Sequence, residues 1–396
     1  MIRESKAVKE KRALEEFEQA LRSLPDPRRA QGKRYSLRAV VVIALMAMVC
    51  GADDAEAIQE WGEANSEWLS TFVELPHGTP TQDVILAVFA ALEPQAFSGV
   101  FLSWMAFLRA RLDLNGGHIA IDGKTSRGSY DRAHERPAVH TVSAWLSDES
   151  LVLGQQKTQE KSNEITAIPQ LLALLDIGGA TVTIDAMGCQ TDIAEVITKA
   201  QGHYILAVKD NQPTLHEEIQ EAFADALDAG PRPLDQSRLT IETYTSTDKG
   251  HGRIEERTLH VCRDLSWIST ASRWSGLEFI AMVESVRTDL SKGTTSTQAR
   301  YYIGSDAKAS TESIANLIRR HWSIENELHW VLDIAFSEDS ARHRAGNCAQ
   351  NFATLRHFAI NLLKSDRTVK LGVANKRKRA GWNRKYLIHL LTGAEC

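Results

Sequence analysis

The chain has 396 residues, of which 43% are hydrophobic and 24% are charged, and its formal net charge is −5. A chain of this length and composition can bury a large core, and we expect it to divide into two or three domains. The overall charge excludes a globally basic nucleic-acid-binding protein, so any affinity for DNA has to come from local groups of Lys and Arg.

Five cysteines are scattered along the chain with no CxxC pair: Cys50, Cys189, Cys262, Cys348 and Cys396. An odd number of isolated cysteines favours reduced thiols over a disulfide framework or a zinc site. We therefore expect a cytoplasmic protein.

Residues 1–115 have a helical pattern, with apolar residues every three or four positions between prolines and glycines. The most apolar stretch, Ala39 to Cys50, is too short to span a bilayer and is followed by polar sequence. We predict a buried core helix there, no membrane segment, and an N-terminal helical domain, for which the family resemblance given below implies a part in recognising DNA ends.

The pattern changes after Gly116-Gly117 to short strands and helices. Residues 116–210 are predicted to form three strands, a helix, a strand, a helix and a strand, with the first three strands as an antiparallel meander. This order is the one found in RNase H-like folds, in which a mixed α/β sheet is covered by helices. The fold would place the strand that ends at Asp185 beside the strand that ends at Asp122.

The rest of the chain is predicted to complete this core in three segments. Residues 211–305 are strand-rich and are expected to form an insertion, residues 306–365 are helical and carry Glu325, and residues 366–396 form a basic tail.

Three carboxylates give the chain its chemistry. Asp122 and Asp185 each follow an apolar strand, and Glu325 lies on an amphipathic helix. Taken singly, each is more often a turn residue or part of a solvated face. Together, in this strand order, they are typical of a site for hard divalent cations, in which two ions roughly 3.5–4 Å apart serve both sides of a scissile phosphate.

The motifs around these residues resemble the insertion-sequence DDE transposases of the ISAS type, the H-repeat-associated protein family. The resemblance covers about residues 15 to 365 and rests on IDGKTSRGSYDR, LVLGQQKTQEKSNEITAIPQLL, VTIDAMGCQTDIAEVI, HYILAVKDNQPTLHEEI and RRHWSIENELHWVLDIAFSEDSARHRAGN. It implies that Asp122, Asp185 and Glu325 form a DDE triad with Mg²⁺ or Mn²⁺, expected as two ions. The implied activity is strand cleavage at the ends of an insertion sequence, followed by transfer of the 3′-hydroxyl into target DNA.

The resemblance is less close around the glutamate. Related enzymes have a tyrosine and an arginine shortly before it and a lysine seven residues after it, where this chain has Ile318, His321 and Leu332. Asp333, two turns after Glu325, is therefore an alternative third carboxylate. A supporting role beside the carboxylate and an ordinary buried position are both open for His329.

Candidate DNA contacts come from local basic residues. Lys124 and Arg127 follow Asp122, and Lys209 ends the fifth strand, although each also fits an exposed loop charge. Further candidates lie near the glutamate and in the acid-free tail: Arg319, Arg320, Lys376, Lys378, Arg377 and Arg379. Lys161 to Glu164 fits a helix cap first and a position near the metal ions second.

The expected partners are double-stranded DNA, as element ends and target, and a second copy of the chain on DNA, in the bacterial cytoplasm at the nucleoid. Two alternatives remain open from the sequence. One is a DNA-binding remnant without catalysis, and the other is an RNase H-like nuclease without strand transfer.

Overall fold

The computed structural model describes residues 21–22, 24–29, 33–112, 116–158, 164–227, 239–250 and 252–392. The chain forms two compact units. The first comprises Met1–Leu114, Gly123–Lys161 and Glu325–Cys396, and the second comprises Asn115–Asp122 and Ser162–Ile324. The chain therefore passes between the units four times: after Leu114, after Asp122, after Lys161 and after Ile324.

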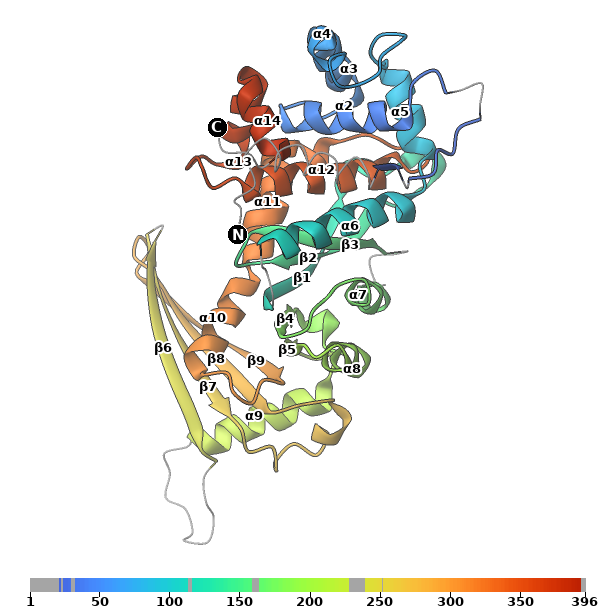
Figure 1. Ribbon diagram of the computed structural model, residues 1–396. Helices are drawn as coiled ribbons and strands as arrows, with labels where there is room; N and C mark the ends of the chain where they lie inside the picture. The colour runs from blue at the N-terminus through green and yellow to red at the C-terminus, as the bar shows by residue number, and fades with distance from the viewer. Residues whose placement is uncertain are drawn as a thin grey trace, which may run out of the picture. The chain divides into compact units, whose positions relative to one another are not determined.

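The first unit is mainly helical and also holds two strands (Figure 1). Its described helices and strands are α2 (Leu37–Val49), α3 (Ala55–Ala64), α4 (Ser66–Leu69), α5 (Gln82–Ala91), α6 (Pro94–Leu112), β2 (Val139–Leu146), β3 (Leu151–Lys157), α11 (Trp330–Phe336), α12 (Cys348–Ser365), α13 (Val373–Trp382) and α14 (Arg384–Thr392). The predicted helix before Leu21 lies outside the described residues.

Helices α2 and α12 form the centre of the first unit. The Ser36 hydroxyl accepts a hydrogen bond from the Ala39 N–H at 3.1 Å and so begins α2. All residues of α2 except Arg38 are buried, and α12 packs along it. The prediction of a buried core helix at Ala39 to Cys50 is confirmed.

Helix α12 is unusual because polar side chains lie on its buried faces. Asn361 binds β3 with both ends of its amide, since its Nδ2 donates to the Val152 carbonyl at 2.8 Å and its Oδ1 accepts from the Val152 N–H at 2.9 Å. The amide therefore satisfies backbone groups that would otherwise be buried without a partner.

Burial of His357 on α12 should make the stability of the first unit depend on pH. Burial, with smaller effects of His329, Arg356 and Lys124, lowers the pKa of His357 from 6.5 to about 3. Between pH 3 and pH 6.5, His357 is therefore protonated in the unfolded chain and neutral in the folded chain. The free energy of unfolding thus falls as the pH drops below 6.5. In urea unfolding at several pH values, His357→Asn should reduce this slope by up to about 1.4 kcal/mol per pH unit. An unchanged slope would contradict a neutral buried imidazole.

The second unit combines a sheet with four described helices. Its elements are β1 (Gly117–Ser126, shared with the first unit), α7 (Glu164–Leu172), β4 (Ala180–Ile184), α8 (Thr191–Lys199), β5 (His203–Val208), α9 (Pro213–Leu227), β6 (Ile241–Gly250), β7 (Arg253–Cys262), β8 (Phe279–Asp289), β9 (Thr294–Gly304) and α10 (Thr311–His321).

Within the described residues, the strands form one nine-stranded sheet in the order β3-β2-β1-β4-β5-β9-β8-β7-β6. Strand β4 runs parallel to both β1 and β5, while β2 and β3 are antiparallel to each other. The order β3-β2-β1-β4-β5, with helices α7 and α8 between the later strands, is the predicted RNase H-like arrangement, and this fold prediction is confirmed.

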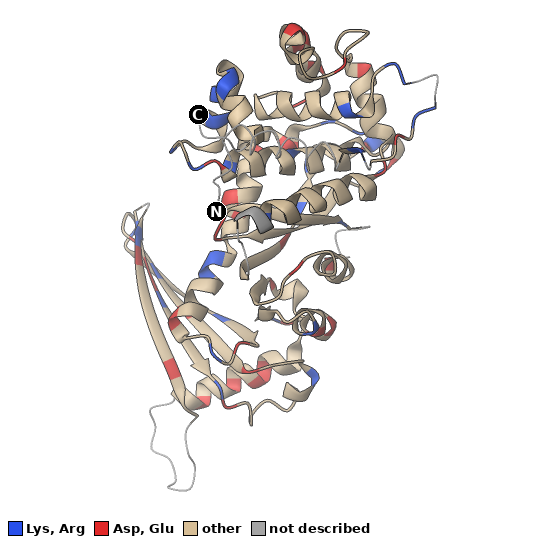
Figure 2. Cartoon of the chain, in the orientation of Figure 1, with Lys and Arg blue, Asp and Glu red and all other residues tan. Residues whose placement is uncertain are grey.

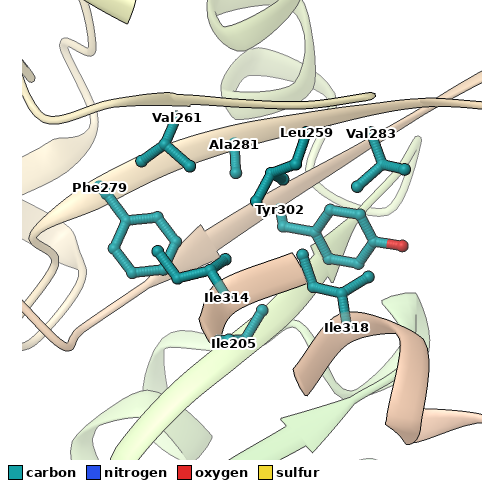
Figure 3. Packing of buried hydrophobic residues seen from close by; sticks show 9 residues of the cluster. All are labelled: Ile205, Leu259, Val261, Phe279, Ala281, Val283, Tyr302, Ile314 and Ile318. Atoms are coloured by element: carbon teal, nitrogen blue, oxygen red, sulfur yellow. The ribbon is translucent and has the colours of Figure 1, made fainter. Parts of the chain in front are cut away.

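The strand-rich residues after 211 continue this sheet. Strand β9 pairs antiparallel with β5, so that Gly304 lies beside Ile205, and β8, β7 and β6 follow outward. Their inner ends pack under α10 through a cluster that includes Phe279, Tyr302, Ile314 and Ile318 (Figure 3). The strands of the segment expected as an insertion therefore extend the same sheet.

No single described helix is both long and apolar enough to cross a membrane. Only the pair Gln82–Ala91 and Pro94–Arg109, bent by 92°, reaches the required length and composition together.

Candidate active site

Asp122 and Asp185 lie at the same level of two neighbouring strands. Strands β1 and β4 pair in parallel register, with Ile121 beside Ile184, and each aspartate is the next residue. Adjacent strands are roughly 4.7–4.9 Å apart. The two strands were predicted to be neighbours, and their pairing confirms it. Asp122 and Asp185 thus lie side by side on two central strands, at the point where the pairing of β1 with β4 ends.

A short turn fixes the Asp185 carboxylate. One of its oxygens accepts hydrogen bonds from the N–H groups of Met187, at 3.1 Å, and Gly188, at 3.4 Å, and so caps the 3₁₀ turn Ala186–Gly188. Gly188 is required because a Cβ there would lie 2.3 Å from the Ile184 side chain and 3.2 Å from Ile168 of α7.

Residues after β5 hold the same turn from the other side. The Asn211 amide donates to the Ala186 carbonyl at 2.7 Å, and the Gln212 amide donates to the Cys189 carbonyl at 2.9 Å. Both side chains are therefore used to position the backbone around Asp185.

The surroundings of Asp185 favour a bound cation. Its side chain reaches solvent, but the protein atoms around it partly desolvate it, and this raises its pKa. The negative charge of Glu164, at the start of α7, raises the pKa further, against the opposing effects of the Gly188 and Met187 N–H groups and of Lys209. A divalent cation would relieve this excess of negative charge, so the oxygen donors fit a hard metal ion.

A buried polar chain links three elements of the second unit. The Thr183 hydroxyl on β4 is hydrogen-bonded to Nε2 of His118 on β1, at 2.8 Å, and to Nδ1 of His321 at the end of α10, at 2.9 Å. Burial lowers the pKa of His321 to about 4, so the ring is neutral at neutral pH. The chain attaches α10 to the strand that leads to Asp185, a role that the sequence did not reveal.

Glu325 belongs to the first unit, whereas Asp122 and Asp185 belong to the second. It is exposed and lies in a π-helical turn, Ile324–His329, a form that is frequent at functional sites. The competing carboxylate, Asp333, forms an ion pair of 2.7 Å with Lys124 in the same unit. The Asp333 carboxylate is therefore engaged by a cation of its own unit.

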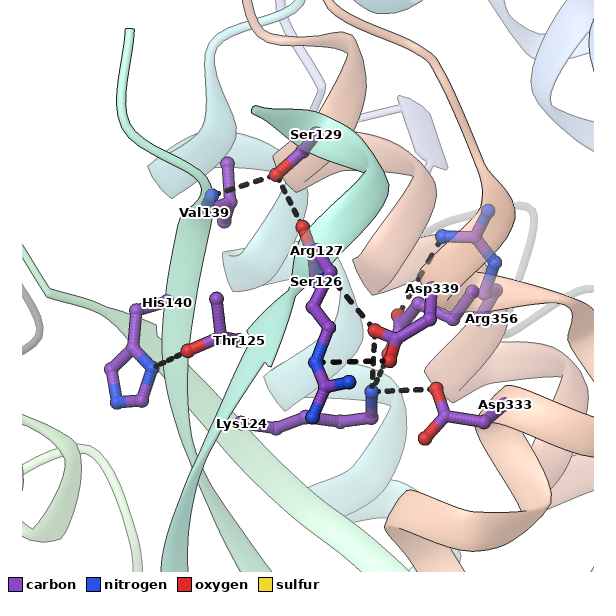
Figure 4. A network of polar contacts seen from close by, with 11 residues as sticks. Lys124, Thr125, Ser126, Arg127, Ser129, Val139, His140, Asp333, Asp339 and Arg356 are labelled. Carbon is purple, nitrogen blue, oxygen red and sulfur yellow. Dashed lines mark hydrogen bonds and ion pairs between the residues drawn. The ribbon is translucent and has the colours of Figure 1, made fainter. Parts of the chain in front are cut away.

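Lys124 lies in a cluster of carboxylates in the first unit (Figure 4). Its ammonium is 2.7 Å from Asp333, 3.3 Å from Asp339 and 3.4 Å from Glu338, and the buried Glu338 also faces Arg356 at 3.6 Å. Burial lowers the pKa of Lys124, but the three carboxylates outweigh this and raise it overall. Since its charge is used internally, the prediction that Lys124 contacts DNA is not supported.

Comparison with known proteins identifies the family. The family model described as "Transposase DDE domain" matches residues 114–362, and its associated N-terminal model matches residues 18–105. The chain belongs to the DDE transposase family.

Two relatives in Escherichia coli (strain K12) resemble this transposase over nearly their full length. YbfL and the "H repeat-associated putative transposase YhhI" are each 39% identical over 376 residues, which is 94% of this chain and 96% of each relative. A solved piggyBac transposase synaptic complex with hairpin DNA is 9% identical, with a TM-score of 0.42, and the match covers 97% of this chain and 81% of that one. The predicted H-repeat-associated family is confirmed.

In this transposase, the described residues contain no group of three or more His, Cys, Asp or Glu side chains placed to hold a metal ion. The metal-binding roles of Asp122, Asp185 and Glu325 therefore stay predictions.

The basic residues predicted to contact DNA divide into exposed and buried groups. The exposed ones are Arg127, Lys209, Arg319, Arg320, Lys378 and Arg379. Among these, Arg127 lies 3.6 Å from Asp339, and Arg319 forms an ion pair of 2.5 Å with Asp248.

Lys376 and Arg377 are buried, which corrects their predicted role. Lys376 donates to the carbonyls of Leu363 and Asp366, at 2.9 and 2.5 Å. Arg377 donates to the carbonyls of Met48 and Ala335 and pairs with Asp53 at 2.7 Å. These two cations hold helices together instead of facing a phosphate, because buried charges need internal partners. No sequence pattern distinguished them from Lys378 and Arg379.

Proposed function

We propose that this transposase cleaves DNA strands at the ends of an insertion sequence and joins the freed 3′-hydroxyl to target DNA, with Mg²⁺ or Mn²⁺ as the cofactor. The observation that carries the proposal is the register of β1 and β4, in which Asp122 and Asp185 are the residues that directly follow the last pair, Ile121 and Ile184. Oxygen donors in such a pair are the ligands that these ions prefer.

Each carboxylate has a distinct role in this proposal. Asp122 and Asp185 bind the metal ions, and Glu325 provides the third ligand, in agreement with the family pattern. When bound, two ions would activate the attacking hydroxyl and stabilise the leaving oxygen. The turn that donates two N–H groups to Asp185 fixes its carboxylate before any ion binds, so less order has to be gained during the reaction.

The substrate of the proposed reaction is double-stranded DNA, as element ends and as target. The exposed cations Arg127, Lys209 and Arg320 are the proposed phosphate contacts. Because transposition holds two element ends together, the active form in this proposal is a homodimer on DNA. Its location is the nucleoid of a bacterial cell.

A cleavage and joining assay tests the proposal. The full chain is incubated with labelled DNA that spans each flank of its coding region, with Mg²⁺, with Mn²⁺ and with EDTA. We expect cuts at both ends and joined products that carry the element end, only with a divalent ion. Cuts without joined products would indicate a nuclease of similar fold, and DNA binding without cuts would indicate a remnant. Either result would refute the proposal.

A further inference from the structure

The last two helices expose basic residues without any acidic neighbour in sequence. Lys378 and Arg379 lie on α13, and Arg384 and Lys385 begin α14. The chain contains no Asp or Glu between Arg367 and Thr392. Figure 2 shows the Lys and Arg of these helices in blue. Together with Trp382, these four residues are called the C-terminal basic surface.

Two buried cations anchor the helix that carries this surface. Lys376 binds carbonyls at the end of α12 and the Asp366 carboxylate at 3.6 Å. Arg377 binds the end of α2 and lies over the Phe336 ring at 4.2 Å. Because these side chains fix one side of α13, Lys378, Arg379 and Trp382 are presented on a rigid support.

The arginines of the surface are held in place by aromatic rings. The Arg379 guanidinium lies 4.7 Å from the centre of the Tyr386 ring, and that of Arg384 lies 4.8 Å from the centre of the Trp68 ring. Tyr386 is itself fixed, since its hydroxyl donates to the Asp366 carboxylate at 2.6 Å. Stacked guanidinium groups lose less freedom when they bind a phosphate, so the surface is organised for anions.

Trp382, the last residue of α13, stands out among these residues. Its side chain is 83% exposed, compared with 60% for Trp330, whereas Tyr386 four residues later is buried. An exposed indole between basic residues of two successive helices matches the combination by which proteins bind single-stranded nucleic acid, in which rings stack on bases and cations follow the backbone.

We propose that the C-terminal basic surface binds DNA that carries an unpaired base, with its cations on phosphates and the Trp382 ring stacked on that base. The identification of DNA as the partner rests on the proposed function. Base faces are covered by their neighbours in an intact duplex, so an indole can stack only where a base has lost its pair or its neighbour. Strand cleavage at an element end creates such positions.

Fluorescence anisotropy in EDTA tests this inference separately from catalysis. Two labelled duplexes of equal length are compared, one fully paired and one with a single unpaired base. Trp382→Ala should weaken binding of the second by about tenfold and of the first by less than twofold, and Trp382→Phe should restore most of the loss. Trp267→Ala, at a 45% exposed tryptophan of the second unit, is the matched control and should leave both affinities unchanged.

Substitution of the basic residues should affect binding differently from substitution of Trp382. Lys378→Ala and Lys385→Ala should weaken both duplexes equally and reduce the slope of log affinity against log salt by about 0.9 each. The inference would be overturned if wild type and Trp382→Ala each bound the two duplexes with equal affinity.

Sedimentation without DNA gives a second test. If the wild-type chain forms a dimer that Trp382→Ala dissociates, the surface binds a second copy of the chain, and the inference is overturned. A preference for the unpaired base that is lost in Trp382→Ala would support the inference even if the cleavage assay failed.

Discussion

Replacement of Asp122 or Asp185 by asparagine should reduce Mg²⁺-dependent cleavage by about 10³-fold or more, because metal ions contribute several kcal/mol of transition-state stabilisation. Asparagine keeps the size of the side chain and, at position 185, an oxygen that can still accept from the N–H groups of Met187 and Gly188. The turn should therefore persist while the charge that binds the ion is lost. DNA binding in EDTA should stay within twofold of wild type.

The measurement combines single-turnover cleavage with Mn²⁺ binding followed by electron paramagnetic resonance. Asp192→Asn, at an exposed carboxylate in the first turn of α8, removes the same charge from the same unit and should change neither quantity. A wild-type cleavage rate in either Asp122→Asn or Asp185→Asn would exclude that residue from the metal site. Lost cleavage with normal Mn²⁺ binding would exclude the proposed role as a ligand.

Local patterns were sufficient to predict the catalytic sheet and its two aspartates. Asp122 and Asp185 each follow a short apolar segment, and strand order alone made the two strands neighbours, as the β1–β4 pairing confirms. The predicted strand end at Asp122 was wrong, because β1 continues to Ser126, whereas β4 does end at Ile184. The position of β6 to β9 depended instead on the pairing of β9 with β5, across a gap of about ninety residues in sequence. Strand patterns do not specify such a partner, so the sequence predicted a strand-rich insertion at residues 211–305 without its place in the sheet.

The buried cations show a second limit of sequence reasoning. Lys124 and its partner Asp333 are 209 positions apart, and Arg377 and the Met48 carbonyl are 329 positions apart. Lys376 and Arg377 stand in a run with Lys378 and Arg379 that looks uniformly solvated. Their division into inner and outer faces is set by the tertiary packing of α13, which a charge pattern does not record.

Lys124→Met should lower the free energy of unfolding by about 3 kcal/mol, because it leaves the carboxylates of Asp333, Glu338 and Asp339 close together without their shared cation. Affinity for DNA should not change, since the ammonium faces these carboxylates. Urea unfolding and anisotropy measure the two quantities on one preparation. A loss of DNA affinity without a loss of stability would restore the role first predicted for Lys124.

The same cluster offers a way to decide between Glu325 and Asp333. Asp333→Asn should cost stability, because it removes the shortest contact of Lys124, and the folded protein should retain metal-dependent cleavage. Glu325→Gln should instead leave stability nearly unchanged and remove cleavage. Its exposed side chain predicts a change in unfolding free energy of less than about 0.5 kcal/mol, whereas cleavage should fall by about 10³-fold.

A double-mutant cycle completes this test. If Asp333 acts on the fold through Lys124, the stability losses of Lys124→Met and Asp333→Asn should not add, because the second substitution removes a contact that the first has already broken. If Asp333 were instead the metal ligand, Asp333→Asn would abolish cleavage both with and without Lys124, and Glu325→Gln would remain active. The two carboxylates differ because one is neutralised by a lysine from strand β1 and the other lies exposed in a π-helical turn. The cycle therefore separates a carboxylate that acts on the fold through Lys124 from one that binds the metal ion.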